Sequence, residues 1–332
     1  MDEFYFDFRW QSTLGIGRFA REVRKRVIGM TDLPQSGSPS SALDCFRTAW
    51  TLRKRKARGF FSPGFNVPVR ASCPVICTVH DLIHIHDEQQ TSLLKKAYYS
   101  RIQGPILRQS PLVLTVSQFS KSQLCDWFDI PEERVRCVGN GISTKFSLDG
   151  AKFKADLPYF LYVGNCRSHK NLGVLIQAFS RLKNSEAVNL IMVTKPDKKL
   201  LRTIDEFNVG TRVSFVLKIS DEKLATYYRS AIATILPSTF EGFGLPLVEA
   251  FACGCPVIGS NVTSIPEVIG DAGLLFDPYD CDDLTEKLSL LVNNNCLRSD
   301  LIKKGLSRAN LYQWDNVGHL INDALVPFVG KR

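Results

Sequence analysis

The chain of 332 residues is 44% apolar and 23% charged, and it carries a formal net charge of +9. These proportions are typical of a folded globular protein, and they exclude a wholly disordered, collagen-like or coiled-coil chain. The length predicts about two domains, and no apolar run reaches the roughly 18 residues that a membrane-spanning helix needs.

Short apolar runs alternate with helical segments along the whole chain. The runs that predict buried strands are residues 4–8, 75–79, 113–116, 134–138, 160–163, 189–193, 213–217, 233–236, 256–258 and 274–276. The segments with helical spacing are residues 16–27, 91–108, 121–128, 172–182, 221–230, 246–252 and 282–294. Strands that are apolar on both faces and separated by helices predict an α/β fold with parallel sheets.

This alternation is interrupted in two places. A gap near residues 147–154 predicts the boundary between an N-terminal domain, residues 1–150, and a C-terminal domain, residues 151–311. Residues 31–70 are rich in Pro, Ser, Gly and basic side chains. We expect them to form a functional or disordered loop, because so long a connection is uncommon in a compact domain.

The positive charge lies mainly in the N-terminal half. Residues 1–150 contain 21 Lys and Arg against 14 Asp and Glu, a net charge of +7. Two groups hold the excess: Arg53, Lys54, Arg55, Lys56 and Arg58, and then Lys95, Lys96, Arg101 and Arg108. A basic half indicates a nucleic acid, an anionic membrane or a phosphorylated substrate as the partner, and charge alone does not choose among them.

The termini and cysteines bear on the cell compartment. The first residues, Met-Asp-Glu-Phe-Tyr-Phe-Asp, are acidic where a signal peptide is basic, so we expect no export signal and a cytoplasmic location. Among the ten cysteines, Cys253 and Cys255 lie in an apolar run, and we expect buried thiols in a reducing compartment.

Two glycine-containing segments each open a predicted helix. Gly15 and Gly17 begin the first, where backbone N–H groups favour a phosphate. The second is the segment 241–246, in which Glu241 precedes the glycines and Glu249 lies inside the following helix. Because carboxylates repel phosphate, these two are expected to accept hydrogen bonds from hydroxyl groups, such as those of a sugar.

Two further loops follow predicted strands, where ligands bind in parallel sheets. The loop 164–171 contains Arg167 and Lys170, which are suited to neutralise a diphosphate. His80 begins a stretch that also holds His84, His86 and Asp87, and histidine with carboxylate is a common metal-ligand set. We expect no metal here, since no second ligand cluster is evident.

Three segments, residues 162–172, 220–258 and 265–273, resemble glycosyltransferase family 4, the retaining nucleotide-sugar glycosyltransferases of the GT-B fold. The family's Glu-x7-Glu signature is met by Glu241 and Glu249, and its glycine-to-lysine loop by Gly164 to Lys170. The resemblance extends from about residue 14 to 314. It implies two Rossmann-like domains facing a central cleft, with residues 312–332 forming a helix that crosses back to the N-terminal domain.

The resemblance also implies roles for individual residues. Glu249 would bind the ribose, Glu241 the transferred sugar and Lys170 the diphosphate, while His80 would lie at the reaction centre. The implied catalytic residues are His80, Lys170 and Glu241. The implied donor-binding residues are Gly15, Gly17, Gly164, Asn165, Arg167, Lys170, Glu241, Gly242, Phe243, Gly244, Leu245 and Glu249. Many members have arginine at the position of Asn165, so Arg167 is the candidate to supply that charge.

The implied reaction is a front-face displacement that needs no metal and no cofactor besides the nucleotide-sugar donor. Similarity to mannosyltransferases implies GDP-mannose, with UDP-sugars as the alternative. The acceptor would be lipid-linked or an oligosaccharide, in O-antigen or exopolysaccharide synthesis. Residues Arg53 to Arg58 would contact the acceptor or the inner face of the cytoplasmic membrane. Two other GT-B activities, a phosphorylase and an epimerase, and a nucleic-acid-binding protein are the rival interpretations.

Overall fold

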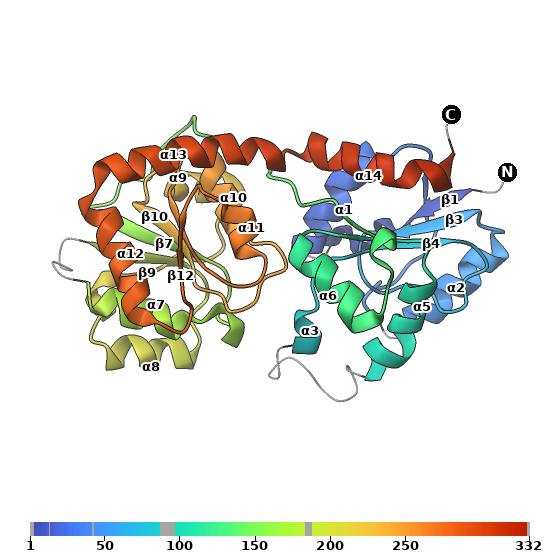
Figure 1. The fold of residues 1–332 in the computed structure, drawn as a ribbon, viewed down its shortest axis with the longest axis horizontal. Coiled ribbons are helices and arrows are strands. Elements are labelled where there is room, and N and C mark those ends of the chain that lie inside the picture. The colour runs from blue at the N-terminus through green and yellow to red at the C-terminus, as the bar shows by residue number, and fades with distance from the viewer. Residues whose placement is uncertain (1–2, 13, 42, 87–96, 183–187, 331–332) are drawn as a thin grey trace. The chain divides into compact units, whose positions relative to one another are not determined.

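The computed structural model describes residues 3–12, 14–41, 43–86, 97–182 and 188–330. The chain forms two compact units (Figure 1), which we call unit 1, Met1–Gly141 with Trp314–Arg332, and unit 2, Ile142–Gln313. The boundary falls earlier than the expected one after residue 150, because the intervening residues pack within unit 2. The Phe146 ring lies 5.8 Å from that of Tyr228, and Arg229 Nε donates to the Ser147 carbonyl at 2.7 Å.

Unit 1 contains a parallel six-stranded sheet in the order β2-β1-β3-β4-β5-β6. Its strands are β1 (Phe4–Phe6), β2 (Thr31–Asp32), β3 (Gly59–Ser62), β4 (Val75–Val79), β5 (Leu112–Thr115) and β6 (Val135–Cys137). Its helices include α1 (Leu14–Arg26), α2 (Asp44–Lys54), α3 (Ile83–His86), α5 (Gly104–Gln109), α6 (Gln118–Phe128) and α14 (Trp314–Val329). The C-terminal helix α14 packs against α1 in this unit.

Residues 31–70 are not the irregular loop that their composition predicts. They contain β2, α2 and β3, and the side chains of Phe60 and Phe61 on β3 are fully buried. These elements are short and are bounded by Pro, Gly and basic residues, which hid them from the sequence pattern. The expected helix 91–108 is described only from residue 97 onward, so Asp87, Lys95 and Lys96 lie outside the described residues.

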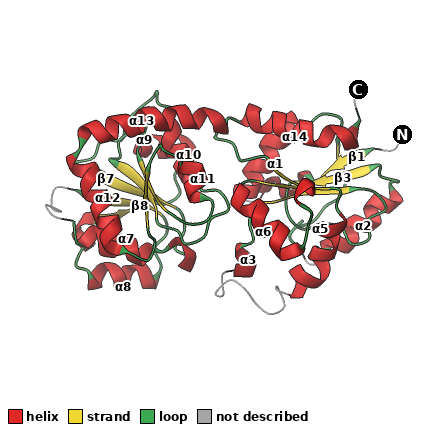
Figure 2. Cartoon of the chain, in the orientation of Figure 1, coloured by secondary structure: helices red, strands yellow, loops and turns green. Residues whose placement is uncertain are grey.

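Unit 2 contains a second parallel six-stranded sheet, in the order β12-β11-β10-β7-β8-β9. Its strands are β7 (Tyr159–Val163), β8 (Asn189–Val193), β9 (Val213–Phe215), β10 (Ala233–Leu236), β11 (Val257–Ser260) and β12 (Leu274–Phe276). Its helices include α7 (Leu172–Ser180), α8 (Lys198–Glu206), α9 (Asp221–Tyr228), α10 (Leu245–Ala252), α11 (Ile265–Ile269), α12 (Cys281–Asn293) and α13 (Asn295–Ala309). Figure 2 shows these helices on both sides of the strands.

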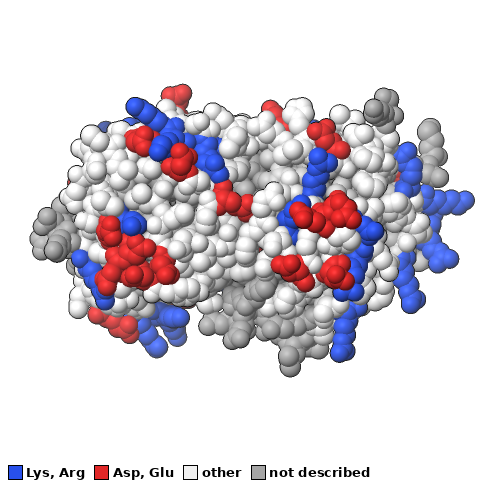
Figure 3. Space-filling view, viewed as in Figure 1, with Lys and Arg blue, Asp and Glu red and all other residues white. Residues whose placement is uncertain are grey.

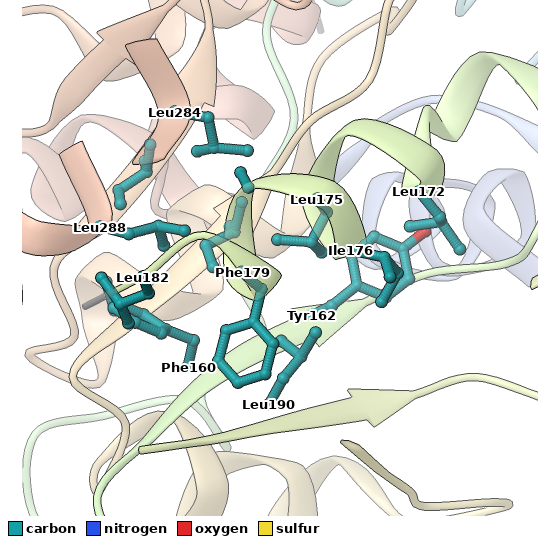
Figure 4. Packing of buried hydrophobic residues seen from close by; sticks show 14 of the residues in the cluster. Phe160, Tyr162, Leu172, Leu175, Ile176, Phe179, Leu182, Leu190, Leu284 and Leu288 are labelled. Carbon is teal, nitrogen blue, oxygen red and sulfur yellow. The ribbon is translucent and has the colours of Figure 1, made fainter. Parts of the chain in front are cut away.

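The core of unit 2 lies between the sheet and helices α7 and α12. Phe160 and Tyr162 of β7 and Leu190 of β8 are fully buried in it. Figure 4 shows these side chains packed against Leu175 and Phe179 of α7. Burial of such side chains is the dominant favourable contribution to folding, and it explains why the apolar runs of the sequence predicted the strands.

The strand order of unit 2 reverses between β7 and β10, its two central strands. From β7 the chain proceeds outward through β8 and β9, then returns to add β10, β11 and β12 on the other side. In open parallel sheets, ligands bind beside the carboxyl ends of the strands at this reversal. The loops 164–171 and 237–244 leave the sheet there, so the fold confirms the parallel α/β architecture and indicates where a site lies.

None of the helices in the described ranges is both long enough and apolar enough to cross a bilayer.

Candidate functional site

The two loops at the reversal of unit 2 are joined to each other. The backbone N–H of Thr239, in the loop after β10, donates to the carbonyl of His169 at 2.8 Å. His169 is in the loop after β7, and its carbonyl also accepts from Thr239 Oγ1 at 3.3 Å. These bonds fix the loop that carries Lys170 relative to the loop that carries Glu241.

An ion pair between Lys170 and Glu241 forms the centre of the site. Lys170 Nζ lies 2.5 Å from Glu241 Oε1, and both side chains are 14% exposed. Ser238 Oγ donates to the same oxygen at 2.6 Å. Within the described part of the chain both hydrogen bonds fall on Oε1, so Glu241 Oε2 is left to accept a bond from a ligand. Ions that are mostly buried interact more strongly than exposed ones, because water screens them less.

The backbone of Glu241 is held by residues that follow β11. Its N–H donates to Thr263 Oγ1 at 3.2 Å, and its carbonyl accepts from Ser264 Oγ at 3.0 Å. Ser260 Oγ donates to the Ser238 carbonyl at 2.5 Å. Thr263 has a φ of 60°, an uncommon conformation for a β-branched residue. None of these hydroxyl residues was a candidate from the sequence, because Ser and Thr are common in loops.

Helix α10 begins at the same edge of the sheet. Gly244 precedes it with a φ of 98°, in the left-handed region that glycine tolerates, and Pro246 lies in its first turn. Gly242 is buried, Leu245 is partly exposed at the first helical position, and the Phe243 ring lies edge-on to Tyr312 at 5.4 Å. Phe243 therefore has a packing role in this structure, while the start of α10, the positive end of its dipole, lies at the edge of the sheet that also carries the ion pair.

Glu249 lies in the second turn of α10 and is only 5% exposed. Its Oε2 accepts a hydrogen bond from the Tyr228 hydroxyl at 3.1 Å. Burial, and to a smaller extent the neighbouring Glu249, raise the pKa of Tyr228 well above its ordinary value, so this hydroxyl stays protonated and donates. The bond fixes the orientation of a carboxylate that the resemblance assigns to the ribose.

The loop after β7 is shaped by Tyr162. Its hydroxyl donates to the Asn165 carbonyl at 2.6 Å, and a Cβ on Gly164 would lie 2.5 Å from that hydroxyl oxygen, so glycine is required there. The Asn165 side chain accepts from the backbone N–H of Arg167 at 3.1 Å. Arg167 is exposed at the start of the turn that carries Lys170, a position compatible with contact to an anion.

The remaining candidates belong to unit 1. Gly15 is exposed near the start of α1. Gly17 is buried, and a Cβ there would lie 2.7 Å from the Gln11 carbonyl oxygen, which explains this glycine by packing alone. The structure thus brings Lys170 and Glu241 into contact in unit 2 and places both glycines in the other unit.

His80 follows β4 in unit 1 and is held on two sides. Its Nε2 lies 3.0 Å from the Pro63 carbonyl, and its ring meets Phe19 edge-on at 4.8 Å. A carbonyl only accepts, so Nε2 carries the proton and Nδ1 is the acceptor. Burial lowers the pKa of His80 below 6.5, which keeps the ring neutral. The described residues contain no cluster of three or more metal-ligating groups.

The basic stretch of unit 1 is exposed, as a contact surface requires. Arg53 and Lys54 end α2, Arg55 and Lys56 follow in the turn, and all four are exposed. Arg58 is also exposed, and its guanidinium donates to the Val329 carbonyl of α14. The side chains of residues 53–56 therefore face solvent, while Arg58 binds the C-terminal end of α14.

Family models match both parts of the chain. Residues 145–308 match the model described as glycosyl transferases group 1, and residues 56–146 match that of glycosyltransferase family 4. The chain is 29% identical over 298 residues to the O-antigen chain mannosyltransferase B of Escherichia coli. This alignment covers 81% of this chain and 74% of that protein. It is 25% identical over 278 residues to the serotype-specific mannosyltransferase WbdA of Escherichia coli, covering 78% of this chain and 33% of WbdA.

Solved structures share the architecture. The crystal structure of Anabaena Alr3699/HepE in complex with UDP and glucose superposes with a TM-score of 0.74 over 98% of this chain and 100% of that chain, at 15% identity. An identity this low shows the fold alone, and the fold is GT-B. The two family matches and the similarity to the Escherichia coli mannosyltransferases show that this chain is a glycosyltransferase and belongs to glycosyltransferase family 4.

Proposed function

We propose that this enzyme transfers mannose from GDP-mannose to a lipid-linked or oligosaccharide acceptor, with retention of the anomeric configuration. The proposed pathway is the assembly of a cell-surface polysaccharide, an O-antigen or an exopolysaccharide, at the cytoplasmic face of the membrane. The names of the Escherichia coli relatives support the sugar and the pathway. The observation that carries the proposal is the contact between Lys170 and Glu241 at the carboxyl ends of β7 and β10.

That contact suits the two ends of an activated sugar. A diphosphate beside Lys170 would be balanced by the ammonium group of Lys170 and by the positive end of α10. The transferred sugar would then lie against Glu241, whose Oε2 accepts from a hydroxyl. In the proposed step the acceptor oxygen bonds to C1 as the bond from C1 to the diphosphate oxygen breaks on the same face. A phosphate oxygen takes the acceptor's proton, and the protein contributes position and charge.

A thermal-shift comparison of nucleotide sugars tests the donor. A ligand that binds only the folded state raises the melting temperature, and a concentration of 100 Kd contributes about 2.7 kcal/mol. We expect GDP-mannose to stabilise the protein more than UDP-glucose or GDP. We expect Lys170→Met to reduce the stabilisation by all three, because each carries the diphosphate that Lys170 would balance. Stabilisation by UDP-glucose alone would favour the UDP-sugar alternative, for which the UDP and glucose bound in the Anabaena protein are the supporting observation.

We also propose that the reaction needs no metal ion, because Lys170 and the start of α10 already oppose the charge of the diphosphate. Transfer of mannose should then proceed at an unchanged rate in excess EDTA. Loss of activity in EDTA, restored by Mg²⁺ or Mn²⁺, would contradict this.

Nucleic-acid binding remains the rival from another class, since unit 1 carries the basic excess. Retention of the protein on immobilised single-stranded DNA, measured at rising salt, separates the two functions. Strong retention together with no stabilisation by any nucleotide sugar would favour the rival.

A further inference from the structure

Helix α2 in unit 1 exposes three large apolar side chains along one side. Leu43, directly before the helix, is 70% exposed, Phe46 is 55% exposed and Trp50 is 63% exposed. These positions are separated by three and four residues, so they form a single stripe on the helix surface. Exposed apolar side chains scattered singly need no explanation, whereas a contiguous stripe marks an interaction surface.

Basic side chains flank this stripe. Arg47 lies beside it in the first half of the helix, and Arg53 and Lys54 lie beside its end, at helical angles adjacent to those of Phe46 and Trp50. Lys54 Nζ lies 5.0 Å from the centre of the Trp50 ring, within cation–π range. Figure 3 shows Lys and Arg gathered at the end of unit 1 where α2 lies in Figure 1. We call these six residues, Leu43, Phe46, Arg47, Trp50, Arg53 and Lys54, the outer face of α2.

The fold fixes which side of α2 faces outward. Asp44, the one acidic residue of the helix, is 2% exposed. Its carboxylate accepts from Arg9 Nη1 at 2.8 Å, from Gln35 Nε2 at 3.1 Å and from Arg47 at 3.0 Å. Cys45 and Leu52 are buried on the same side. The buried side therefore anchors the helix, and the exposure of the apolar stripe is a consequence of this anchoring.

We infer that the outer face of α2 docks on the surface of an anionic lipid bilayer. An aromatic and aliphatic stripe bordered by Lys and Arg is the pattern of helices that lie in the membrane interface. Tryptophan is enriched at that depth because its ring is amphipathic, and each nearby cation adds attraction to anionic lipids. The outer face carries no carboxylate, so a second copy of the same face would be repelled.

This inference gives the membrane contact of the proposed function a defined surface. The inference rests on the proposed function in one respect: the membrane contact would hold the enzyme close to a lipid-linked acceptor. Binding to vesicles is measured without donor or acceptor, so the result stands apart from the donor experiment.

Cosedimentation of the full chain with vesicles tests the inference. Vesicles of equal phosphatidylcholine and phosphatidylglycerol should bind the protein, vesicles of phosphatidylcholine alone should bind it far more weakly, and salt should reduce binding. The double variant Phe46→Ser, Trp50→Ser should lower the partition coefficient at least tenfold. The double variant Arg53→Gln, Lys54→Gln leaves the anchoring bond of Arg47 in place and should lower it by about fivefold per cation, which corresponds to about 1 kcal/mol each.

Matched controls remove similar side chains elsewhere. Trp127→Ser on α6 removes a tryptophan that is 45% exposed, and Lys198→Gln, Lys199→Gln removes two exposed cations from α8. Both should bind like wild type, and Phe46→Ser, Trp50→Ser should hydrolyse the donor at the wild-type rate with an unchanged melting temperature.

Three outcomes would overturn the inference. They are wild-type binding by both outer-face variants, equal losses in the controls, and retention of the wild type on single-stranded DNA but not on anionic vesicles.

Discussion

Both units have a point where the order of parallel strands reverses, and the residues at the two reversals differ in how fully they are paired. In unit 1 the reversal lies between β1 and β3. Trp10 is 1% exposed and its Nε1 donates to Ser62 Oγ at the end of β3. A Cβ on Gly64 would lie 2.5 Å from the Trp10 ring. At this reversal the indole of Trp10 is therefore buried and bonded within the protein.

The charged residues show the same contrast. After β1, the guanidinium of Arg9 lies between two buried carboxylates, with Nε 2.7 Å from Asp7 and Nη1 2.8 Å from Asp44. In unit 2 the pair of Lys170 and Glu241 is more exposed, and one carboxylate oxygen is left for a ligand. Strand order indicates where a site can form, and the pairing of the charged residues then distinguishes the two units.

The largest expected effect comes from the ion pair of Lys170 and Glu241 in unit 2, which we call the open pair because Glu241 Oε2 is left to accept a bond. Lys170→Met or Glu241→Gln removes a charge that we place on the donor, and each should lower kcat for mannose transfer by about 10²- to 10³-fold, as for other electrostatic contributions to catalysis. Initial rates at saturating GDP-mannose, with circular dichroism melting as the check on folding, measure this.

Two controls sharpen the result. Lys198→Met on α8 and Glu286→Gln on α12 make the same chemical changes at exposed positions of unit 2, and neither should alter kcat. Wild-type turnover in Lys170→Met or Glu241→Gln would show that the open pair is not where the donor is held.

Substitutions in the buried cluster of Arg9, Asp7 and Asp44 in unit 1 should lower the stability of the protein. Arg9→Met leaves the buried Asp7 without its cation, while Asp44 keeps Arg47. Removing one partner of a buried ion pair typically costs about 3–5 kcal/mol. All four tryptophans, Trp10, Trp50, Trp127 and Trp314, belong to unit 1. Urea unfolding followed by tryptophan fluorescence therefore reports on this unit, and its midpoint should fall. Arg9→Lys keeps the positive charge but loses the planar guanidinium that bonds both carboxylates, and it should lower the midpoint less than Arg9→Met does. An unchanged midpoint in Arg9→Met would refute a structural role.

The sequence predicts the strands well where burial on both faces leaves a clear apolar run. It misses β3 because the four residues of that strand directly follow a basic stretch. It misses α2 because the exposed side of that helix carries Phe46 and Trp50 instead of polar residues. Cys253 and Cys255 are 1% and 2% exposed, which confirms the expected buried thiols, and burial raises the pKa of each to about 12.

The site is predictable only in part, because its contacts join distant positions. The motif spacing identified Lys170 and Glu241 as separate candidates, yet their contact depends on β7 and β10 being neighbours in the sheet. Thr263 and Ser264 act on the backbone of Glu241, and hydroxyl residues in loops are too common to single out without the fold. Gly17 shows the reverse case, in which a glycine that suggested phosphate binding is explained by the nearby carbonyl of Gln11.

The smallest expected effect concerns pH and tests whether His80 is held neutral by unit 1. Burial lowers the pKa of His80 in the folded state below the 6.5 of the unfolded chain, so the folded protein binds fewer protons. The contribution to stability is then fully present above pH 6.5, and it is lost as the pH falls below that value and the unfolded chain takes up the proton. Melting temperatures between pH 5.5 and 7.5 should fall more steeply on acidification for wild type than for His80→Asn. The exposed His319→Asn is the matched control and should keep the wild-type slope. Parallel curves for wild type and His80→Asn would mean that His80 titrates alike in both states, and that the Pro63 carbonyl and the Phe19 ring do not hold it neutral.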